Sequence, residues 1–267
     1  MQTRDPFGLG PQTLAGRTAL VCGASAGIGK ATAVALASLG ARVIALARTE
    51  AALKEVVAGL PGEGHRALAC DLNDHARLTE LLKKELERAP IEILVNNSAG
   101  PKGGPIVEAK PEEFTLAFTQ HILTAQLLAQ LLTPGMRDRG YGRIVNVIST
   151  SVRVPIPNLG VSNTIRGAMA SWAKTMSLEL GPHKITVNSV LPGYTETERL
   201  STLLQGTATR LGKTPEAVAD EWKGATPARR FGKPEEIAAA VAFLASPLAG
   251  FINGVVLPVD GGRTGSI

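Results

Sequence analysis

Short apolar segments of strand length alternate with segments of helical length along most of this chain of 267 residues. The predicted strands are Thr18–Val21, Val43–Ala47, Ala67–Cys70, Ile91–Val95, Ile144–Ile148, Thr186–Leu191 and Val255–Val259. The predicted helices are Ile28–Leu39, Glu50–Ala58, Ala76–Glu87, Glu112–Leu132, Ile165–Leu180 and Pro234–Leu244. Apolar strands that are each followed by a helix predict a parallel sheet covered on both faces. Right-handed crossovers then give an α/β fold with a doubly wound parallel sheet of about seven strands.

The sequence shows no composition change that would mark a second domain. Residues 14–267 are therefore predicted to form one domain, preceded by a flexible tail over residues 1–13 that holds two Pro and two Gly. The segment at about 194–231 is a long excursion after the sixth strand. Because ligands bind beyond the carboxyl ends of the strands in such sheets, this segment is predicted to be a substrate lid.

Several classes of protein are excluded by composition. No apolar run reaches the ~18 residues of a transmembrane helix, and Met1–Gly10 lacks the apolar core of a secretion signal. Cys22 and Cys70 are too few for a disulfide framework and lack metal-ligand spacing, so we expect no metal site and a cytoplasmic location. The net charge of +5 suits an anionic small molecule or an acidic partner. Nucleic-acid binding is not expected, since the basic residues form no dense cluster.

A glycine-rich turn joins the first predicted strand to the first helix. Glycines at 23, 27 and 29 allow a tight turn and a close approach to a pyrophosphate, and the helix N-terminus offers free N–H groups. The alternative is a turn that only packs the helix closely, but the strand–turn–helix context favours a dinucleotide site of the Rossmann type. The candidate cofactor-binding residues here are Gly23, Ser25, Gly27, Ile28 and Gly29.

The ends of the next two strands carry further cofactor candidates. Arg48 stands where an acidic residue would bind a ribose 2′-hydroxyl, and an arginine pairs with a 2′-phosphate instead. This predicts NADP(H) rather than NAD(H), with a solvated strand-end arginine as the alternative. Asp71 follows the third strand, where it would accept a hydrogen bond from the adenine amino group or else cap the next turn or helix.

Further motifs complete a resemblance. Asn96-Asn97 and Ala99-Gly100 follow the fourth strand, with Ser98 as an insertion or replacement between them. The other motifs are Pro134-Gly135-Met136, the segment 142–146, Asn188 to Gly193 and Val259-Asp260-Gly261-Gly262. With these motifs the chain resembles the short-chain dehydrogenase/reductase family from about Leu14 to Gly262, especially its 3-oxoacyl-[acyl-carrier-protein] reductase-like branch. The resemblance implies hydride transfer between NADP(H) and a carbonyl or alcohol. It also implies cofactor contacts from Asn97, Pro192, Gly193 and Thr195.

The catalytic positions depart from the family pattern. In the family a Tyr donates the proton, and a Lys four residues later holds the nicotinamide ribose and lowers the Tyr pKa. A Ser thirteen residues before the Tyr polarises the carbonyl, and an Asn on the preceding long helix completes a proton relay. Ser149 keeps the Ser position, but Ser162 replaces the Tyr. Arg166 replaces the Lys and His121 replaces the Asn. A serine hydroxyl is far more basic than a tuned Tyr, and arginine does not exchange protons, so the usual mechanism does not run unchanged.

The catalytic candidates are therefore Ser149, Ser162, Arg166 and His121. We expect Ser149 to contact the substrate, with a hydrogen bond to the adjoining loop as the alternative. Arg166 is also expected to bind the cofactor ribose or phosphate; with Ser162 and Asn163 it would form a polar clamp, or these residues would only cap a helix beginning near Leu159.

Two residues are candidates for a substitute proton donor. His121 is a residue type that titrates near neutrality, and Tyr194 follows Pro192-Gly193 at the mouth of the site. An exposed or satisfied histidine and a packing or lid tyrosine are the alternatives.

Three functions remain open at this point. The first is an NADP(H)-dependent oxidoreductase with a rearranged proton donor; the second is a catalytically silent NADP(H)-binding sensor or partner subunit; the third is a non-redox reaction on the same scaffold. The surviving cofactor motifs favour the oxidoreductase class. The substrate is expected to be a small molecule, with a carrier-protein-bound form compatible with the basic charge. Apolar residues on helices 112–132 and 165–180, read with the resemblance, imply a homo-dimer or homo-tetramer.

Overall fold

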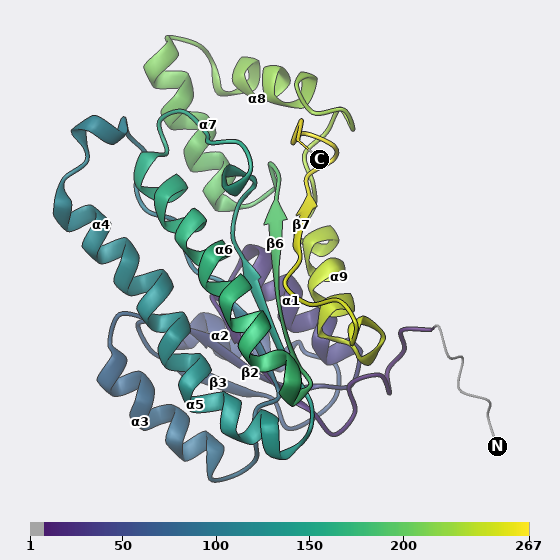
Figure 1. Cartoon of the computed structure of the whole chain (residues 1–267). Helices are drawn as coiled ribbons and strands as arrows, with labels where there is room; N and C mark the ends of the chain where they lie inside the picture. Colours follow the sequence, from purple (N-terminus) through teal and green to yellow (C-terminus); the bar gives the residue numbers. More distant parts are fainter. Residues whose placement is uncertain (1–7, 267) are drawn as a thin grey trace.

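Seven parallel strands form one sheet in the order β3-β2-β1-β4-β5-β6-β7 in the computed structural model, which describes residues 8–266 (Figure 1). The strands are β1 (Thr18–Cys22), β2 (Arg42–Ala47), β3 (Arg66–Ala69), β4 (Ile93–Asn96), β5 (Gly142–Val147), β6 (Ile185–Pro192) and β7 (Val256–Val259). From β1 the chain builds the sheet outward to β3, then returns to place β4 on the other side of β1. The predicted doubly wound fold of the Rossmann type is thus confirmed, with its switch point between β1 and β4.

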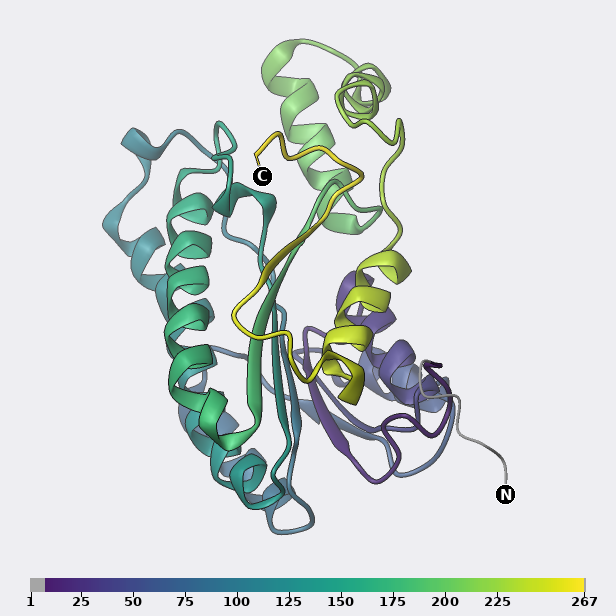
Figure 2. The same ribbon diagram turned by 45° about the vertical axis from the view of Figure 1, so that its right-hand side comes forward.

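Helices cover both faces of the sheet (Figures 1 and 2). One face packs against α1 (Gly27–Ser38), α2 (Glu50–Ala58) and α9 (Pro234–Ala245), and the other against α3 (His75–Leu86), α5 (Thr124–Asp138) and α6 (Gly160–Leu180). Consecutive residues Leu20 and Val21 of β1 are both fully buried, each in the apolar cluster of a different face. Successive strand side chains point to opposite faces, so a strand covered on both sides reads as a continuous apolar run.

The predicted long helix over 112–132 is interrupted in the structure. α4 (Pro111–Phe118) leads into one π-helical turn, Thr119–Leu123, and α5 follows directly. The prediction of one regular helix ending at Leu132 was wrong in both respects, since α5 also continues past Pro134 to Asp138. A π-turn widens the helix locally and is frequent at functional sites; here it contains His121.

The segment 194–231 contains two helices, α7 (Glu198–Leu211) and α8 (Pro215–Gly224), which extend beyond the carboxyl ends of the strands (Figure 2). The Thr197 hydroxyl caps α7 by accepting from the Leu200 N–H at 3.4 Å, and the Thr214 hydroxyl caps α8 in the same way. This arrangement is compatible with the predicted lid.

Part of the predicted N-terminal tail is ordered, and residues 1–7 of it lie outside the described residues. Gly10 and Thr13 close a hydrogen-bonded turn, in which the Gly10 N–H donates to the Thr13 hydroxyl at 2.9 Å. The predicted tail therefore has local hydrogen bonds over residues 10–13. Short 3-10 helices occur at Ile106–Glu108, Thr150–Val152, Gly181–His183 and Pro247–Ala249. None of the helices within residues 8–266 has both the length and the apolar character of a membrane span.

Candidate active site

The glycine turn between β1 and α1 has the shape that the sequence predicts. Gly23 and Gly27 adopt φ values of 61° and 52°, which favour glycine over other residues. A Cβ at Gly29 would stand 2.0 Å from the Gly23 carbonyl oxygen, so that position has room for glycine only. The Asn97 side-chain amide donates to the Cys22 carbonyl at 3.2 Å. The loop after β4 thereby braces the turn, which leads into the α1 N-terminus, where a pyrophosphate cradle is expected.

Other predicted cofactor residues lie around this turn. Ser25 and Ile28 are half-buried within it. At the end of β6, the Gly193 N–H donates to the Val259 carbonyl at 3.0 Å, and the Thr195 hydroxyl donates to the Gly193 carbonyl at 3.1 Å. The methyl group of Thr197 lies 3.1 Å from the point where a Cβ at Gly27 would stand. The beginning of α7 therefore contacts the glycine turn, a role for Thr197 that the sequence analysis did not identify.

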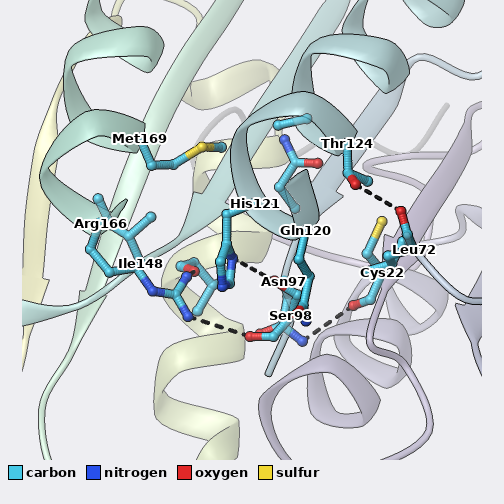
Figure 3. Close-up of a pocket in the computed structure, with 13 residues that line it drawn as sticks. Cys22, Leu72, Asn97, Ser98, Gln120, His121, Thr124, Ile148, Arg166 and Met169 are labelled. Atoms are coloured by element: carbon cyan, nitrogen blue, oxygen red, sulfur yellow. Dashed lines mark hydrogen bonds between the residues drawn. The ribbon is translucent and has the colours of Figure 1, made fainter. Parts of the chain in front are cut away.

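A cleft opens at the carboxyl ends of β1, β4 and β5 (Figure 3). Its empty volume is about 310 Å³, including space open to solvent, and its lining includes Asn97, Ser98, His121 and Arg166. Burial raises the pKa of the Cys22 thiol, which also lines the cleft, to about 12, so this thiol stays protonated. The structure therefore brings His121 and Arg166 together in one cleft, and Asn97, which lines the same cleft, connects it to the glycine turn.

Ser98 connects the two substituted catalytic positions. Its hydroxyl oxygen lies 2.7 Å from Nδ1 of His121, and its carbonyl oxygen accepts from Nη2 of Arg166 at 3.4 Å (Figure 3). Arg166 also donates to the Val147 carbonyl at 3.1 Å. The other imidazole nitrogen, Nε2, is buried without a hydrogen-bond partner in the described residues. Sequence reasoning noted Ser98 as an irregularity of the motif but did not place it in the site.

The environment of His121 changes its protonation. Burial and, after it, the positive charge of Arg166 together lower the pKa of His121 to about 3. The expectation that His121 titrates near neutrality was therefore wrong, because the buried site does not solvate an imidazolium ion. Burial, followed by the charge of Arg199, lowers the pKa of Arg166 to about 10, so Arg166 remains charged at neutral pH.

The predicted serines do not line this cleft in the described structure. The Ser149 hydroxyl accepts from the Ser151 N–H at 3.1 Å, which is the loop hydrogen bond weighed as its alternative role. Ser162 is buried in the first turn of α6, and Asn163 donates to the Ile156 carbonyl at 2.9 Å. A clamp that includes Asn163 is therefore not formed, because its amide holds the loop before α6. That helix begins at Gly160, which confirms the expected start near Leu159 and not the bound at Ile165.

Tyr194 packs within the lid instead of facing His121. Its ring stacks on Trp222 with the ring centroids 4.4 Å apart. The guanidinium carbon of Arg263 lies 4.2 Å from the centroid of the Tyr194 ring. The Tyr194 hydroxyl also accepts from Arg263 at 3.1 Å. These contacts correspond to the packing role that was the alternative to a proton donor.

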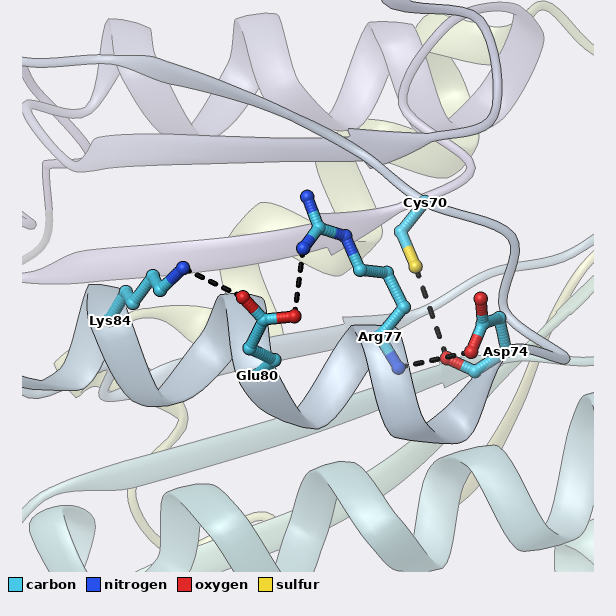
Figure 4. Close-up of polar contacts among 5 residues, drawn as sticks. All are labelled: Cys70, Asp74, Arg77, Glu80 and Lys84. Carbon is cyan, nitrogen blue, oxygen red and sulfur yellow. Dashed lines mark hydrogen bonds and ion pairs between the residues drawn. The ribbon is translucent and has the colours of Figure 1, made fainter.

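Arg48 and Asp71 are exposed at the carboxyl ends of β2 and β3. The Asp71 carboxylate accepts from the Asn73 N–H at 2.8 Å, so it caps the turn before α3. Asp74, at the start of α3, accepts from the Arg77 N–H at 3.0 Å, and Arg77 continues into surface ion pairs (Figure 4). Within residues 8–266 no cluster of His, Cys, Asp and Glu has the arrangement of a metal site.

Comparison with known proteins extends these observations. The family model described as Enoyl-(Acyl carrier protein) reductase matches residues 23–264. The 3-oxoacyl-[acyl-carrier-protein] reductase FabG of Vibrio cholerae is 34% identical over 256 residues, covering 93% of this chain and 98% of that protein. Human L-xylulose reductase is 35% identical, covering 93% and 97%. The crystal structure of L-sorbose reductase from Gluconobacter frateurii, complexed with NADPH and L-sorbose, has a TM-score of 0.88 at 28% identity, covering 96% and 100%. This chain belongs to the short-chain dehydrogenase/reductase family.

Proposed function

We propose that this protein is an NADP(H)-dependent oxidoreductase that acts on a carbonyl or hydroxyl group of a small-molecule substrate. The glycine turn fits the cofactor, since Gly29 leaves a backbone cradle that any Cβ would fill. Arg48 is exposed at the end of β2, free to pair with a 2′-phosphate. When bound, NADPH supplies the hydride. Relatives of this chain that carry the same fold are NADPH-dependent reductases.

The observation that carries the proposal is the unpaired, buried Nε2 of His121 at the cleft. At neutral pH the imidazole is neutral, so one nitrogen carries hydrogen and the other accepts. If Nδ1 accepts from the Ser98 hydroxyl, Nε2 carries the hydrogen and donates to the substrate oxygen. A neutral imidazole can polarise a carbonyl in this way. As hydride from the bound cofactor would form the new C–H bond and the C=O π bond would break, Nε2–H would hold the oxygen, which would take its proton from solvent water.

Arg166 and Ser149 have supporting roles in this proposal. Arg166 places a positive charge beside the developing alkoxide and toward the cofactor ribose, without exchanging a proton. Ser149 uses its oxygen to accept from Ser151, and its O–H remains able to donate to a substrate oxygen. Ser162 stands where the family has Tyr but is buried in α6 outside the cleft lining, so it has no role in this proposal. Carrier-protein-bound substrates are included, as the likeness to FabG supports.

Two measurements test the proposal. Titration of the protein with NADPH, followed by cofactor fluorescence, is expected to show saturable binding, and absence of binding at millimolar NADPH would refute the cofactor assignment. Turnover is then measured with 3-oxoacyl thioesters, ketones and quinones. We expect His121→Gln to abolish most of this activity and Tyr194→Phe to retain it, because Tyr194 is held by Trp222 and Arg263.

A catalytically silent NADP(H)-binding protein is the second candidate. This function is favoured by the low pKa of His121, about 3, because a neutral imidazole does not act as a general acid near neutral pH. Ser162, at the position of the family's Tyr, does not supply such an acid either. NADPH binding without turnover of any of the three substrate classes would support this function over the first.

We also propose that the chain assembles as a homo-dimer or homo-tetramer. Leu116, Phe118 and Leu123 are exposed along α4 and the π-turn, and Leu178 is exposed on α6. Exposed apolar side chains on neighbouring helices suit a self-complementary interface. Sedimentation is expected to show an oligomer that Leu116→Glu weakens; a monomeric wild-type protein would contradict this.

A further inference from the structure

Two arginine side chains from different helices converge on Gly100, in the loop after β4. Arg166 comes from α6 and Arg199 from α7, at the beginning of the lid. The Nη2 atoms of Arg199 and Arg166 lie 3.4 Å and 3.8 Å from the point where a Cβ at Gly100 would stand. Arg166 is only 7% exposed, so one of the two positive charges is almost entirely removed from water.

Neither arginine is neutralised by a carboxylate. Within residues 8–266, neither forms an ion pair, and their hydrogen bonds go to the carbonyl oxygens of Val147, Ser98 and Pro101. Elsewhere two arginines that are more exposed pair with carboxylates, since Arg66 binds Glu85 at 2.5 Å and Arg139 binds Glu92 at 3.2 Å. Both of those glutamates are buried. The buried Arg143 also donates only to backbone carbonyls, but the ring of Tyr141 lies 4.1 Å from its guanidinium carbon.

Two neighbouring positive charges with little solvent are costly unless a negative charge joins them. The charge of Arg199 acts on Arg166, since after burial it is the second cause that lowers the pKa of Arg166. The guanidinium groups still have unused N–H donors, because Arg166 makes two hydrogen bonds to carbonyls and Arg199 makes one. Such donors match the geometry of a carboxylate or phosphate.

Gly100 presents no side chain to the two guanidinium groups. Its φ is not in the left-handed region, so the backbone there does not itself require glycine. A side chain would instead fill the space in front of the two Nη2 atoms. Arg166 also lines the cleft, and Ser98 links it to His121, because Arg166 donates to the Ser98 carbonyl and the Ser98 hydroxyl contacts His121.

We infer that Arg166 and Arg199 together bind an anionic group, a carboxylate or a phosphate, in front of Gly100. Two ligands could supply it. A substrate with a carboxylate near its carbonyl group would place the carbonyl toward His121, which makes the substrate an oxo acid or hydroxy acid; this assignment rests on the proposed function. A cofactor phosphate is the second source, since Thr197, two residues before Arg199, contacts the glycine turn. Anion binding itself does not depend on turnover.

The test uses isothermal titration of the full chain with malonate and with its neutral counterpart malonamide, and a parallel titration with NADPH. Malonate is expected to bind at least about tenfold more tightly than malonamide, and Arg199→Met is expected to remove this preference. Arg210→Met, an exposed position on the same helix, changes the net charge equally and is the matched control. Gly100→Ala keeps both charges, fills the space, and is also expected to weaken malonate binding; it replaces Arg199→Met if that variant does not fold.

The outcomes separate the two sources. Loss of malonate binding in Arg199→Met with an unchanged NADPH affinity assigns the site to a substrate carboxylate. A weakening of NADPH binding of about tenfold or more, with malonate displaced by NADPH, assigns it to a cofactor phosphate. Equal binding of malonate and malonamide, or malonate binding that is unchanged in both Arg199→Met and Gly100→Ala, overturns the inference. A protein that binds malonate in this way but turns over no substrate would refute the proposed oxidoreductase and leave the anion site intact.

Discussion

The hydroxyl oxygen of Ser98 lies 2.7 Å from Nδ1 of His121, and this contact joins the loop after β4 to the π-turn between α4 and α5. The two residues are 23 positions apart, and the buried imidazole has no other hydrogen-bond partner in the described residues. Which nitrogen of His121 carries the hydrogen therefore depends on Ser98. A hydroxyl that donates to Nδ1 leaves Nε2–H for the cleft.

Ser98→Ala is expected to lower the turnover rate while the protein stays folded. Loss of one hydrogen bond of this kind is about 1 kcal/mol, which is about fivefold in rate when the bond orients a catalytic group. Ser98→Thr keeps the hydroxyl and should retain most of the activity. The nitrogen-15 chemical shifts of His121 report the tautomer directly: Nε2–H is expected in the wild-type protein and a mixture in Ser98→Ala. An Nδ1–H tautomer in the wild-type protein would contradict the assignment of Nε2 as donor.

The free energy of unfolding is expected to decrease as the pH is lowered from 6.5 to 3, because of His121. Its pKa is about 3 in the folded protein and near 6.5 when unfolded, so below pH 6.5 the unfolded chain binds a proton that the folded chain does not. The contribution is complete above pH 6.5 and declines by about 1.4 kcal/mol per pH unit down to pH 3. Urea unfolding between pH 7 and 4 measures this slope. His121→Gln should flatten it by about one proton, and an equal slope in both proteins would show that His121 titrates normally.

Most of the fold follows from local sequence patterns, whereas much of the site does not. The central strands were predicted because both of their faces are buried, as for Leu20 and Val21 in β1, which leaves an uninterrupted apolar run. The glycine turn was predicted because its conformation allows few residue types, as at Gly23. Each of these features is encoded within a few consecutive residues.

The features that were missed depend on tertiary structure. Nothing in the local sequence distinguishes the π-turn at His121 from an ordinary helical turn. The contact of Ser98 with His121 and the approach of Arg199 to Arg166 require the sheet order and the path of the lid. The lowered pKa of His121 follows from burial and a neighbouring charge, which residue type alone does not give.

Gly29→Ala is expected to impair cofactor binding. A Cβ there would stand 2.0 Å from the Gly23 carbonyl oxygen, so the turn must shift. Strain of about 2 kcal/mol corresponds to about thirtyfold in the Kd for NADPH. The control is Gly206→Ala in α7, where a Cβ meets nothing within 4 Å and the φ is not left-handed. That variant is expected to be about 0.5–1 kcal/mol more stable with unchanged NADPH affinity. Equal NADPH affinity in both variants would show that the turn does not hold the cofactor.

Arg48→Ala is expected to weaken NADPH binding selectively. Arg48 is exposed at the carboxyl end of β2 and forms no ion pair within residues 8–266, so its guanidinium is free to pair with a 2′-phosphate. Loss of charge-assisted hydrogen bonds of about 2 kcal/mol raises the Kd for NADPH about thirtyfold. NADH lacks that phosphate, so its Kd should change little. Arg42→Ala removes the same charge at the opposite end of β2 and should leave both affinities unchanged. A parallel loss of NADPH and NADH binding in Arg48→Ala would show that Arg48 does not recognise the 2′-phosphate.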